Sequence, residues 1–264
     1  MVGRLVVATA LAVIVGSGPT PATRPAPVAA ATAQTIEDQI LGWLNNDRVA
    51  RGLVPLRLDS RLRDLAEYRA GVMASTGILS HTIAGCLSCQ LTARAIQWFS
   101  EGEVIAWTSY SWGDPAAAWI YNFWMTSAPH RSLLMSSTFN YVGIGIAYRS
   151  ANKTTWASMV FTESVDHTRP WAKNVSHSRT GSTVYWSWTG ADTRLQTHTA
   201  GLKNFDVEYR VDSGSWTVIL WGTTAKSLTL TSRPSGHYYG LRVRARDNRG
   251  YLSGWTTEIR IWVP

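Results

Sequence analysis

The sequence predicts an α+β domain followed by an all-β domain, and three observations support this prediction. In residues 34–166 the apolar residues first recur at helical spacing and later form short runs that are typical of strands. After Asp166 the chain becomes a series of short β-rich runs separated by Gly, Ser, Asn and Asp. The charge changes at the same place, because residues 34–166 hold 10 Lys/Arg and 11 Asp/Glu whereas residues 167–264 hold 13 and 6. We therefore expect two domains, residues 34–166 and 167–264.

Residues 1–33 have the pattern of a secretory signal peptide followed by a Pro/Ala spacer. Arg4 precedes an apolar run from Leu5 to Val15, which is too short to cross a bilayer as a mature helix. An A-x-A cleavage pattern ends at Ala33. No later segment is apolar enough to span a membrane, so we expect a secreted protein that is extracellular or associated with a cell wall.

The first domain opens with two predicted helices. Ile36, Ile40 and Leu44 recur at helical spacing, and Gly52 follows as a stop signal. A second helix is expected to begin at Asp59 or Ser60 and to end at Gly77. Its buried residues are predicted to be Leu62, Leu65, Ala66 and Met73.

The centre of this domain, residues 78–113, is rich in turn formers and is predicted to be irregular. Asp114 and Pro115 predict the next helix start, because Asp can cap free N–H groups and Pro lacks one to satisfy. Ser127 is expected to cap a short helix with His130 in its first turn, where the helix dipole favours the neutral imidazole. The strands predicted after it are residues 141–148 and 155–162.

The second domain is predicted to be a β-sandwich, since its short apolar runs are separated by turn residues. A long loop, residues 189–204, separates the first two predicted strands. The expected strands are residues 184–188, 205–211, 216–220, 227–230 and 238–245.

Cys86 and Cys89 are the two cysteines of the chain and have C-x-x-C spacing. In a cytosolic protein with a thioredoxin-like pattern this spacing would indicate redox chemistry, whereas in an exported protein a local disulfide is the better interpretation. The pair alone lacks the two further ligands that structural zinc requires. We expect a disulfide that pins the loop between His81 and Glu103.

Three short stretches carry the most informative side chains: residues 79–81 with His81, residues 102–106 with Glu103, and residues 124–131 with His130. Two imidazoles and a carboxylate can bind a divalent cation, share protons or hold a polar ligand group. In order and spacing these stretches resemble the CAP superfamily, also called SCP, and its bacterial secreted branch in particular. The resemblance covers roughly residues 36–163.

This resemblance implies an α/β/α sandwich with a cavity lined by His81, Glu103 and His130. The family's second acidic residue would fall near Ser127, so a set of three is implied, and zinc or another divalent cation would suit it as a cofactor. The chain has no H-E-x-x-H and no G-x-S-x-G pattern, which leaves a zincin or an α/β-hydrolase mechanism without support. Glu101 would share a face with Glu103 on an extended chain, as a paired-carboxylate glycosidase would need, but we expect Glu101 to be solvated.

The second domain resembles a fibronectin type III module over about residues 170–264. The run from Tyr239 to Ala245 matches that family's late strand, and Trp186 or Trp188 would be its early core tryptophan. Seven tryptophans lie in residues 167–264, more than one small sandwich buries, so some are expected at the surface. Trp186 and Trp188 share a face and are candidates for surface binding; the alternative is that they belong to an extended core.

Three functions remain open from the sequence. We favour a secreted CAP-domain protein whose His/His/Glu cavity binds a small ligand or divalent cation, and whose basic second domain tethers it to an anionic cell-wall polymer, glycan or lipid surface. One alternative is an extracellular hydrolase with His81, Glu103 and His130 as catalytic residues, and the other is a non-catalytic adhesion protein. Binding is preferred because the second acid is missing. The basic charge could equally serve solubility, and no specific nucleic-acid partner is expected.

Overall fold

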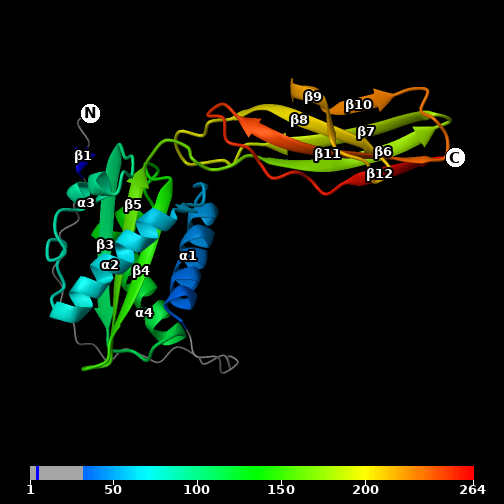
Figure 1. Ribbon diagram of the computed structural model, residues 1–264. Coiled ribbons are helices and arrows are strands. Elements are labelled where there is room, and N and C mark those ends of the chain that lie inside the picture. The colour runs from blue at the N-terminus through cyan, green and yellow to red at the C-terminus, as the bar shows by residue number, and fades with distance from the viewer. Residues whose placement is uncertain (1–3, 6–31) are drawn as a thin grey trace. The chain divides into compact units, whose positions relative to one another are not determined.

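The computed structural model describes residues 4–5 and 32–264 (Figure 1). The chain forms two compact units. Unit 1 ends at Val165 and also includes Leu195–Thr197, whereas unit 2 comprises Asp166–Arg194 and His198–Pro264. Most of the predicted signal peptide lies outside the described residues.

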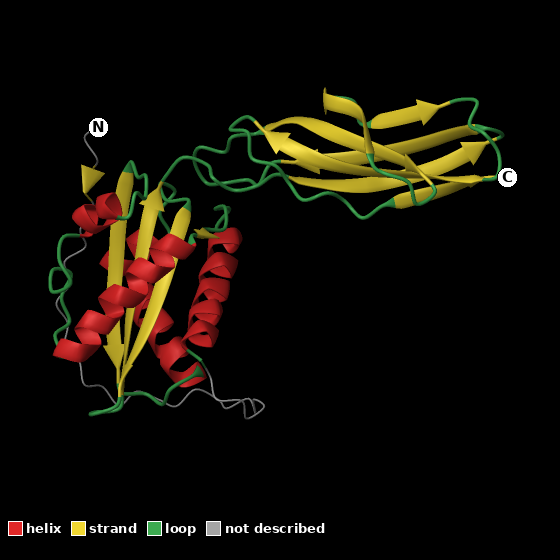
Figure 2. Cartoon of the chain, viewed as in Figure 1, coloured by secondary structure: helices red, strands yellow, loops and turns green. Residues whose placement is uncertain are grey.

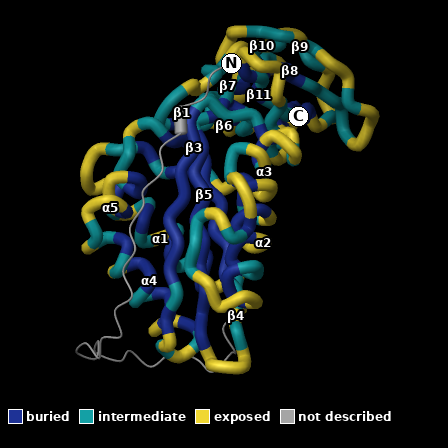
Figure 3. Tube along the Cα trace, turned by 90° about the vertical axis from the view of Figure 1, so that its left-hand side faces the viewer, coloured by how far each residue is buried: buried dark blue, intermediate teal, exposed yellow. Residues whose placement is uncertain are grey.

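Unit 1 is built on a five-stranded sheet with the order β1-β3-β5-β4-β2. The three long strands are antiparallel, with β5 between β3 and β4. Two-residue strands add in parallel at both edges. In Figure 3 the long strands are the buried centre of this unit. The strands are β1 (Arg4–Leu5), β2 (Arg57–Leu58), β3 (Ser100–Thr108), β4 (Tyr141–Arg149) and β5 (Thr154–Glu163).

Helices cover both faces of this sheet, which confirms the predicted α/β/α sandwich (Figure 2). One face packs against α1 (Ala33–Ala50), α4 (Asp114–Thr126) and α5 (Ala128–Leu134). The other face packs against α2 (Ser60–Thr76) and α3 (Leu87–Ala93). Because both faces are covered, most residues of the three long strands are buried.

Helix α2 begins and ends as its sequence predicts. Asp59 is the N-cap and accepts a hydrogen bond from the Arg61 N–H, and Gly77 ends the helix in the left-handed conformation at φ 72°. The α2 backbone lies directly on Gly143 and Gly145 of β4, where an added Cβ would collide with the main chain of Leu62 and of Ala66–Glu67. These glycines therefore set how closely α2 approaches the sheet, and α2 carries part of the site.

Two predicted caps are wrong in detail. Gly113, not Asp114, is the N-cap of α4, and the Asp114 carboxylate accepts a hydrogen bond from the Gln39 amide at 2.6 Å instead. Ser127 is the N-cap of α5 but its hydroxyl makes no capping bond. Pro in the first turn of each helix removes one of the N–H groups that a cap would satisfy.

The prediction that residues 78–113 are irregular is also wrong, since this segment contains both α3 and β3. Strand β3 pairs with β5 along its whole length, from Ser100 opposite Glu163 to Thr108 opposite Thr155. Two glutamates interrupt its apolar pattern, and long-range pairing overrides that local signal.

Unit 2 is an all-β sandwich of a three-stranded sheet, β10-β7-β6, and a four-stranded sheet, β12-β11-β8-β9. Its core joins residues from both sheets, including Val184 of the first and Leu241 and Val243 of the second. The Tyr239 hydroxyl donates to the Pro234 carbonyl at 2.7 Å. Strands β6 and β12 were not anticipated from the sequence. The strands are β6 (Trp171–Thr180), β7 (Thr183–Ala191), β8 (Leu202–Val211), β9 (Thr217–Thr223), β10 (Ser227–Leu230), β11 (His237–Asp247) and β12 (Ile259–Val263).

Trp186 and Trp188 are 1% and 2% exposed and lie in the core of unit 2. The prediction that they bind a surface is therefore wrong, and the extended-core alternative is right. They are two residues apart on β7, so both side chains point inward, toward the facing sheet. The exposed tryptophans of this unit include Trp171, Trp221 and Trp262.

No helix in the described part of the chain has the length and apolar character needed to span a membrane.

Candidate functional site

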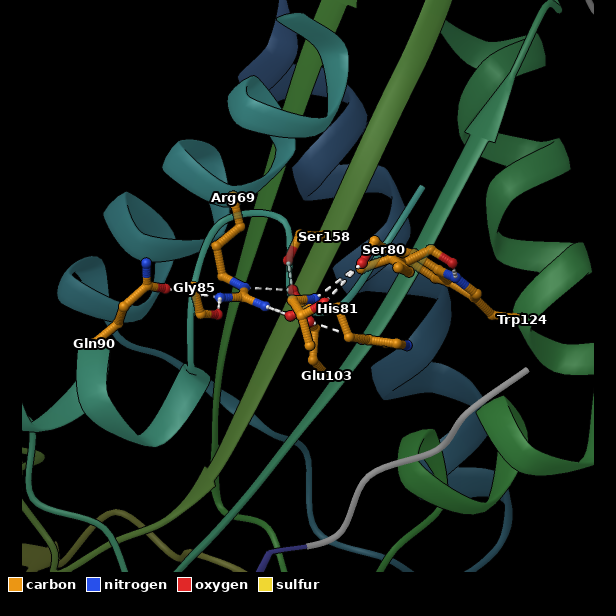
Figure 4. A network of polar contacts seen from close by, with 10 residues as sticks. Arg69, Ser80, His81, Gly85, Gln90, Glu103, Trp124 and Ser158 are labelled. Carbon is orange, nitrogen blue, oxygen red and sulfur yellow. Dashed lines mark hydrogen bonds and ion pairs between the residues drawn. The ribbon is translucent and has the colours of Figure 1, made fainter. Parts of the chain in front are cut away.

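Glu103 is the centre of a buried polar network in unit 1 (Figure 4). It lies on β3 and is 5% exposed. Both carboxylate oxygens accept hydrogen bonds, Oε1 from Arg69 Nε at 2.6 Å and from the Ser158 hydroxyl at 2.7 Å, and Oε2 from an Arg69 terminal nitrogen at 2.9 Å. Burial alone would raise the pKa of Glu103, but the hydrogen bonds from His81 and Arg69 outweigh it and lower the pKa. Glu103 is therefore an ionised anchor.

Arg69 holds Glu103 from the opposite layer, since it projects from α2 onto the face of β3. Its guanidinium also donates to the backbone carbonyls of His81 at 2.6 Å and Gly85 at 3.1 Å, and to the Gln90 side chain at 2.7 Å. Its side chain is 1% exposed. All of these partners accept hydrogen bonds, so the buried positive charge is fully surrounded by oxygen atoms.

His81 lies in the loop after α2, and its Nδ1 is 2.8 Å from Glu103 Oε2. An ionised carboxylate only accepts, so Nδ1 of His81 carries a proton, and in the neutral tautomer of the ring Nε2 is then an acceptor. Nε2 is buried and has no hydrogen-bond partner among the described residues. Arg69 thus fixes His81 twice, through its backbone carbonyl and through Glu103.

His130 lies in the first turn of α5 and is 2% exposed. Burial, and then the repulsion that a protonated His81 would add, lower the pKa of His130, so its imidazole is neutral at physiological pH. Its Nδ1 is also buried without a hydrogen-bond partner in the described part of the chain. The link of His130 to the Glu103 network is its electrostatic interaction with His81, since no hydrogen bond joins it to His81 or Glu103 among the described residues.

Glu101 is buried, not solvated as the sequence predicted, and is 0% exposed. It lies two residues before Glu103 on β3, so both side chains point to the same face of the sheet, toward α2 and α3. Burial raises the pKa of Glu101 to about 7, and the opposing charge of Arg69 does not offset this. Two carboxylates on one strand face thus differ in ionisation, because Glu103 alone receives the bonds of Arg69 and His81.

The arrangement of His81, His130 and Glu103 does not fit the metal-binding site that the sequence predicted. Both oxygens of Glu103 are already taken by Arg69, His81 and Ser158. Within residues 4–5 and 32–264, no group of three or more His, Cys, Asp or Glu side chains is placed to hold a metal ion. Zinc sites need at least three protein ligands of this kind, so the geometry favours hydrogen bonding over metal coordination.

Arg69, Ser158 and Gln90 are parts of this site that were not predicted from the sequence. A signal for Arg69 was present, because it continues the apolar stripe of Leu62, Leu65 and Ala66 on α2, where a charge needs a buried partner. Ser158 lies between apolar residues of β5 and carries no local signal. Gln90 belongs to α3, which was not predicted.

The predicted disulfide is present and joins Cys86 to Cys89. Cys86 is the N-cap of α3, and its sulfur accepts a hydrogen bond from the Cys89 N–H at 3.2 Å. Gly85 and Gln90, which hold Arg69, directly flank the two cysteines in the sequence.

Comparison with protein families places a match to CAP, the cysteine-rich secretory protein family, at residues 41–162. No curated protein matches the sequence. Among solved structures, the chain is similar to an extracellular protein with an SCP domain from Bacillus anthracis, at 22% identity and a TM-score of 0.42, covering 50% of this chain and 41% of that one. A cysteine-rich secretory protein from Staphylococcus aureus gives 22% identity, a TM-score of 0.41 and coverage of 52% and 40%.

A further similarity is to an Fn3-like protein from Clostridium thermocellum, at 20% identity and a TM-score of 0.28, covering 37% of this chain and 96% of that one. The chain spans about two fifths of the length of the Bacillus and Staphylococcus proteins.

Proposed function

Since unit 1 contains a CAP domain, we propose that it is the binding domain of an exported protein, in which His81 and His130 hold a small polar ligand and Glu103 fixes His81. Unit 2, as a fibronectin type III-like module, attaches this domain to an anionic cell-wall polymer. The protein acts by binding, not by catalysis.

One observation carries the binding proposal: Nε2 of His81 and Nδ1 of His130 are both buried and both lack a partner among the described residues. A buried polar atom without a hydrogen bond costs about 1–3 kcal/mol, so such atoms mark places where a ligand or water belongs. Because Nε2 of His81 accepts, the ligand supplies a donor such as a hydroxyl group. Glu103 has no free lone pair in a favourable position and acts only through His81.

The binding proposal is tested with a panel of hydroxylated probes, namely glucose, N-acetylglucosamine and glycerol phosphate, titrated by calorimetry. We expect at least one probe to bind, with affinity lowered about tenfold or more in His81→Ala and in His130→Ala, because one lost hydrogen bond corresponds to roughly 1.4 kcal/mol. His237→Ala is the matched control, since His237 also pairs with a carboxylate, Asp212, at 2.7 Å but lies in unit 2. Equal affinities in all variants would remove the two histidines from the site.

A hydrolase is the second candidate, and the orientation of His81 favours it. A carboxylate on Nδ1 and a free Nε2 are the arrangement of an oriented general base. Ser80 is no evident nucleophile, because its hydroxyl bonds Thr82 at 3.1 Å. Cleavage of an ester or glycoside of the bound probe, abolished in His81→Ala, would establish catalysis; binding without turnover supports the first proposal.

The attachment proposal rests on uncompensated charge along β6. The arginines of β8 and β11 are paired with acids, as in Arg244 with Asp206 at 2.9 Å. In contrast, Lys173 and Arg179 of β6 are exposed and appear in no ion pair among the described residues, and Trp171, two residues before Lys173, is 46% exposed. Exposed cations next to an aromatic ring suit an anionic polymer.

Attachment is tested by retention of the full chain on immobilised teichoic acid at low and high salt. We expect Lys173→Ser/Arg179→Ser to reduce retention severalfold at low salt, and added salt to weaken wild-type binding, because salt screens exposed charges. Lys153→Ser, an exposed lysine of unit 1, is the control. If the control loses as much as the β6 variant, the charge serves solubility alone.

A further inference from the structure

The Cys86–Cys89 disulfide is exposed, in contrast to the buried network beside it. Both cysteines lie at the surface, whereas Arg69 and Glu103 are 1% and 4% exposed in their side chains. The two sulfurs are separated by three positions in the sequence, and the described residues contain no free cysteine that could compete for them. A thiol in solution can therefore reach this bond, and the bond can break and re-form within one short segment.

The surroundings of Cys86 stabilise it as a thiolate once the bond is broken. Its sulfur receives the Cys89 N–H at 3.2 Å and lies 3.2 Å from the Ser88 hydroxyl. These hydrogen bonds stabilise negative charge on the Cys86 sulfur as it departs. Cys86 is therefore the better leaving group in exchange, and the expected point of attack is the sulfur of Cys89.

We propose that Cys86–Cys89 is a reversible redox site, exchanged by an extracytoplasmic dithiol, and that its state controls how firmly Arg69 holds Glu103 and His81. A thiolate of the dithiol attacks Cys89 Sγ, the Cys86–Cys89 bond breaks, and Cys86 leaves as the thiolate. The second thiol of the dithiol then attacks the mixed disulfide, so that Cys89 is released and takes up a proton. Two electrons pass from the dithiol, which becomes a disulfide, to this pair.

The link to the site is formed by the neighbours of the two cysteines. Gly85 precedes Cys86 and Gln90 follows Cys89, and both accept hydrogen bonds from the same Arg69 nitrogen, at 3.1 and 2.7 Å. The Gln90 side chain also donates to the Ala84 carbonyl, which ties the two ends of the segment together. The disulfide thus fixes both acceptors at once. Reduction frees them to move independently and leaves Arg69 with only Glu103 and His81 as partners.

The first test is reduction of the folded full chain with dithiothreitol, followed by alkylation and mass spectrometry. We expect two alkyl groups to be added without denaturant, and the disulfide to return on removal of the reductant. Ser88→Ala should slow reduction severalfold, because it removes a hydrogen bond to the leaving thiolate. Thr92→Ala on the same helix, whose hydroxyl bonds a backbone carbonyl, should not. A disulfide that reacts only in denaturant would overturn the proposal.

The second test measures coupling to the site through reaction of histidines with diethyl pyrocarbonate. In reduced, alkylated protein and in Cys86→Ser/Cys89→Ser we expect His81 to react several times faster than in the oxidised protein, while His237 is unchanged. Equal His81 rates in oxidised and reduced protein would show a disulfide with no influence on the site and would contradict the proposal. These readouts need no ligand, so they stand or fall independently of the binding proposal.

Discussion

Each unit contains an arginine–carboxylate pair that can be compared: Arg69–Glu103 of unit 1 is buried, whereas Arg242–Glu208 of unit 2 remains partly exposed. Arg69 and Glu103 are almost inaccessible, and each has several partners of opposite kind. In unit 2, Arg242 pairs with Glu208 while its side chain remains 27% exposed, and its guanidinium lies 4.3 Å from the Trp216 ring and 4.8 Å from the Trp255 ring.

The difference shows how burial changes the role of one interaction. In a surface ion pair, water screens the attraction between the two charges and can solvate either charge when the other is lost, so the pair adds little stability. A buried pair must remain intact, because either partner alone is an uncompensated charge. The buried pair can therefore hold His81 in one position. The partly exposed contacts of Arg242 with Trp216 and Trp255 cover a sheet face but hold no other side chain in a fixed position.

The largest expected effect is that of Arg69→Met. This variant leaves the Glu103 carboxylate buried without its main partner, so we expect a loss of about 3–5 kcal/mol in the free energy of unfolding. Chemical denaturation of the full chain measures it, with separate transitions assigned to the two units. A loss below about 1 kcal/mol would mean that water replaces Arg69.

Next in size is the pH-dependent effect of Glu101→Gln. The folded pKa of Glu101 is raised to about 7, above its value in the unfolded chain, so the unfolded state loses its proton first. Stability due to this group is therefore highest at acidic pH and falls as pH rises toward 7, by up to about 3 kcal/mol.

Glu101→Gln should remove that fall, and denaturation curves at a series of pH values measure it. Glu37→Gln is the matched comparison, because burial also raises the pKa of Glu37 to about 7 and its own fall should persist in Glu101→Gln. A pH dependence identical to that of the wild type in Glu101→Gln would show that Glu101 is solvated after all.

Ser158→Ala removes one of the hydrogen bonds to the Glu103 carboxylate. A bond to a charged group contributes about 1.5–3 kcal/mol, so we expect a loss of about 2 kcal/mol in unit 1 and a rise in the pKa of Glu103. Ser80→Ala, whose hydroxyl bonds only Thr82 at an exposed position, should cost much less. Equal losses would indicate that Ser158 does not support the carboxylate.

The smallest effect is expected for Arg242→Met in unit 2. The lost ion pair and cation–π contacts are partly exposed, so we expect about 1 kcal/mol, reduced further by added salt. A loss as large as that of Arg69→Met would remove the contrast between the two units.

The layers of unit 1 were implied by the resemblance to the CAP superfamily, and the sequence itself predicted its first two helices from periodic stripes and end signals such as Asp59 and Gly77. It also predicted the disulfide. It failed at β3, whose pairing with β5 is long-range, and at Glu101, whose burial depends on the layer of α2 and α3 above it. Side chains such as Ser158 and Gln90 enter the site only through tertiary contacts, which no local pattern encodes.

The central claim is that Glu103 is an ionised anchor that presents Nε2 of His81 to a ligand. Nitrogen-15 NMR of the imidazole rings in the oxidised full chain tests it most directly. We expect His81 to be protonated at Nδ1, this pattern to change in Glu103→Gln, and the His130 ring to stay neutral below the usual pKa of histidine. A His81 ring protonated at Nε2 alone, or unaffected by Glu103→Gln, would contradict the account.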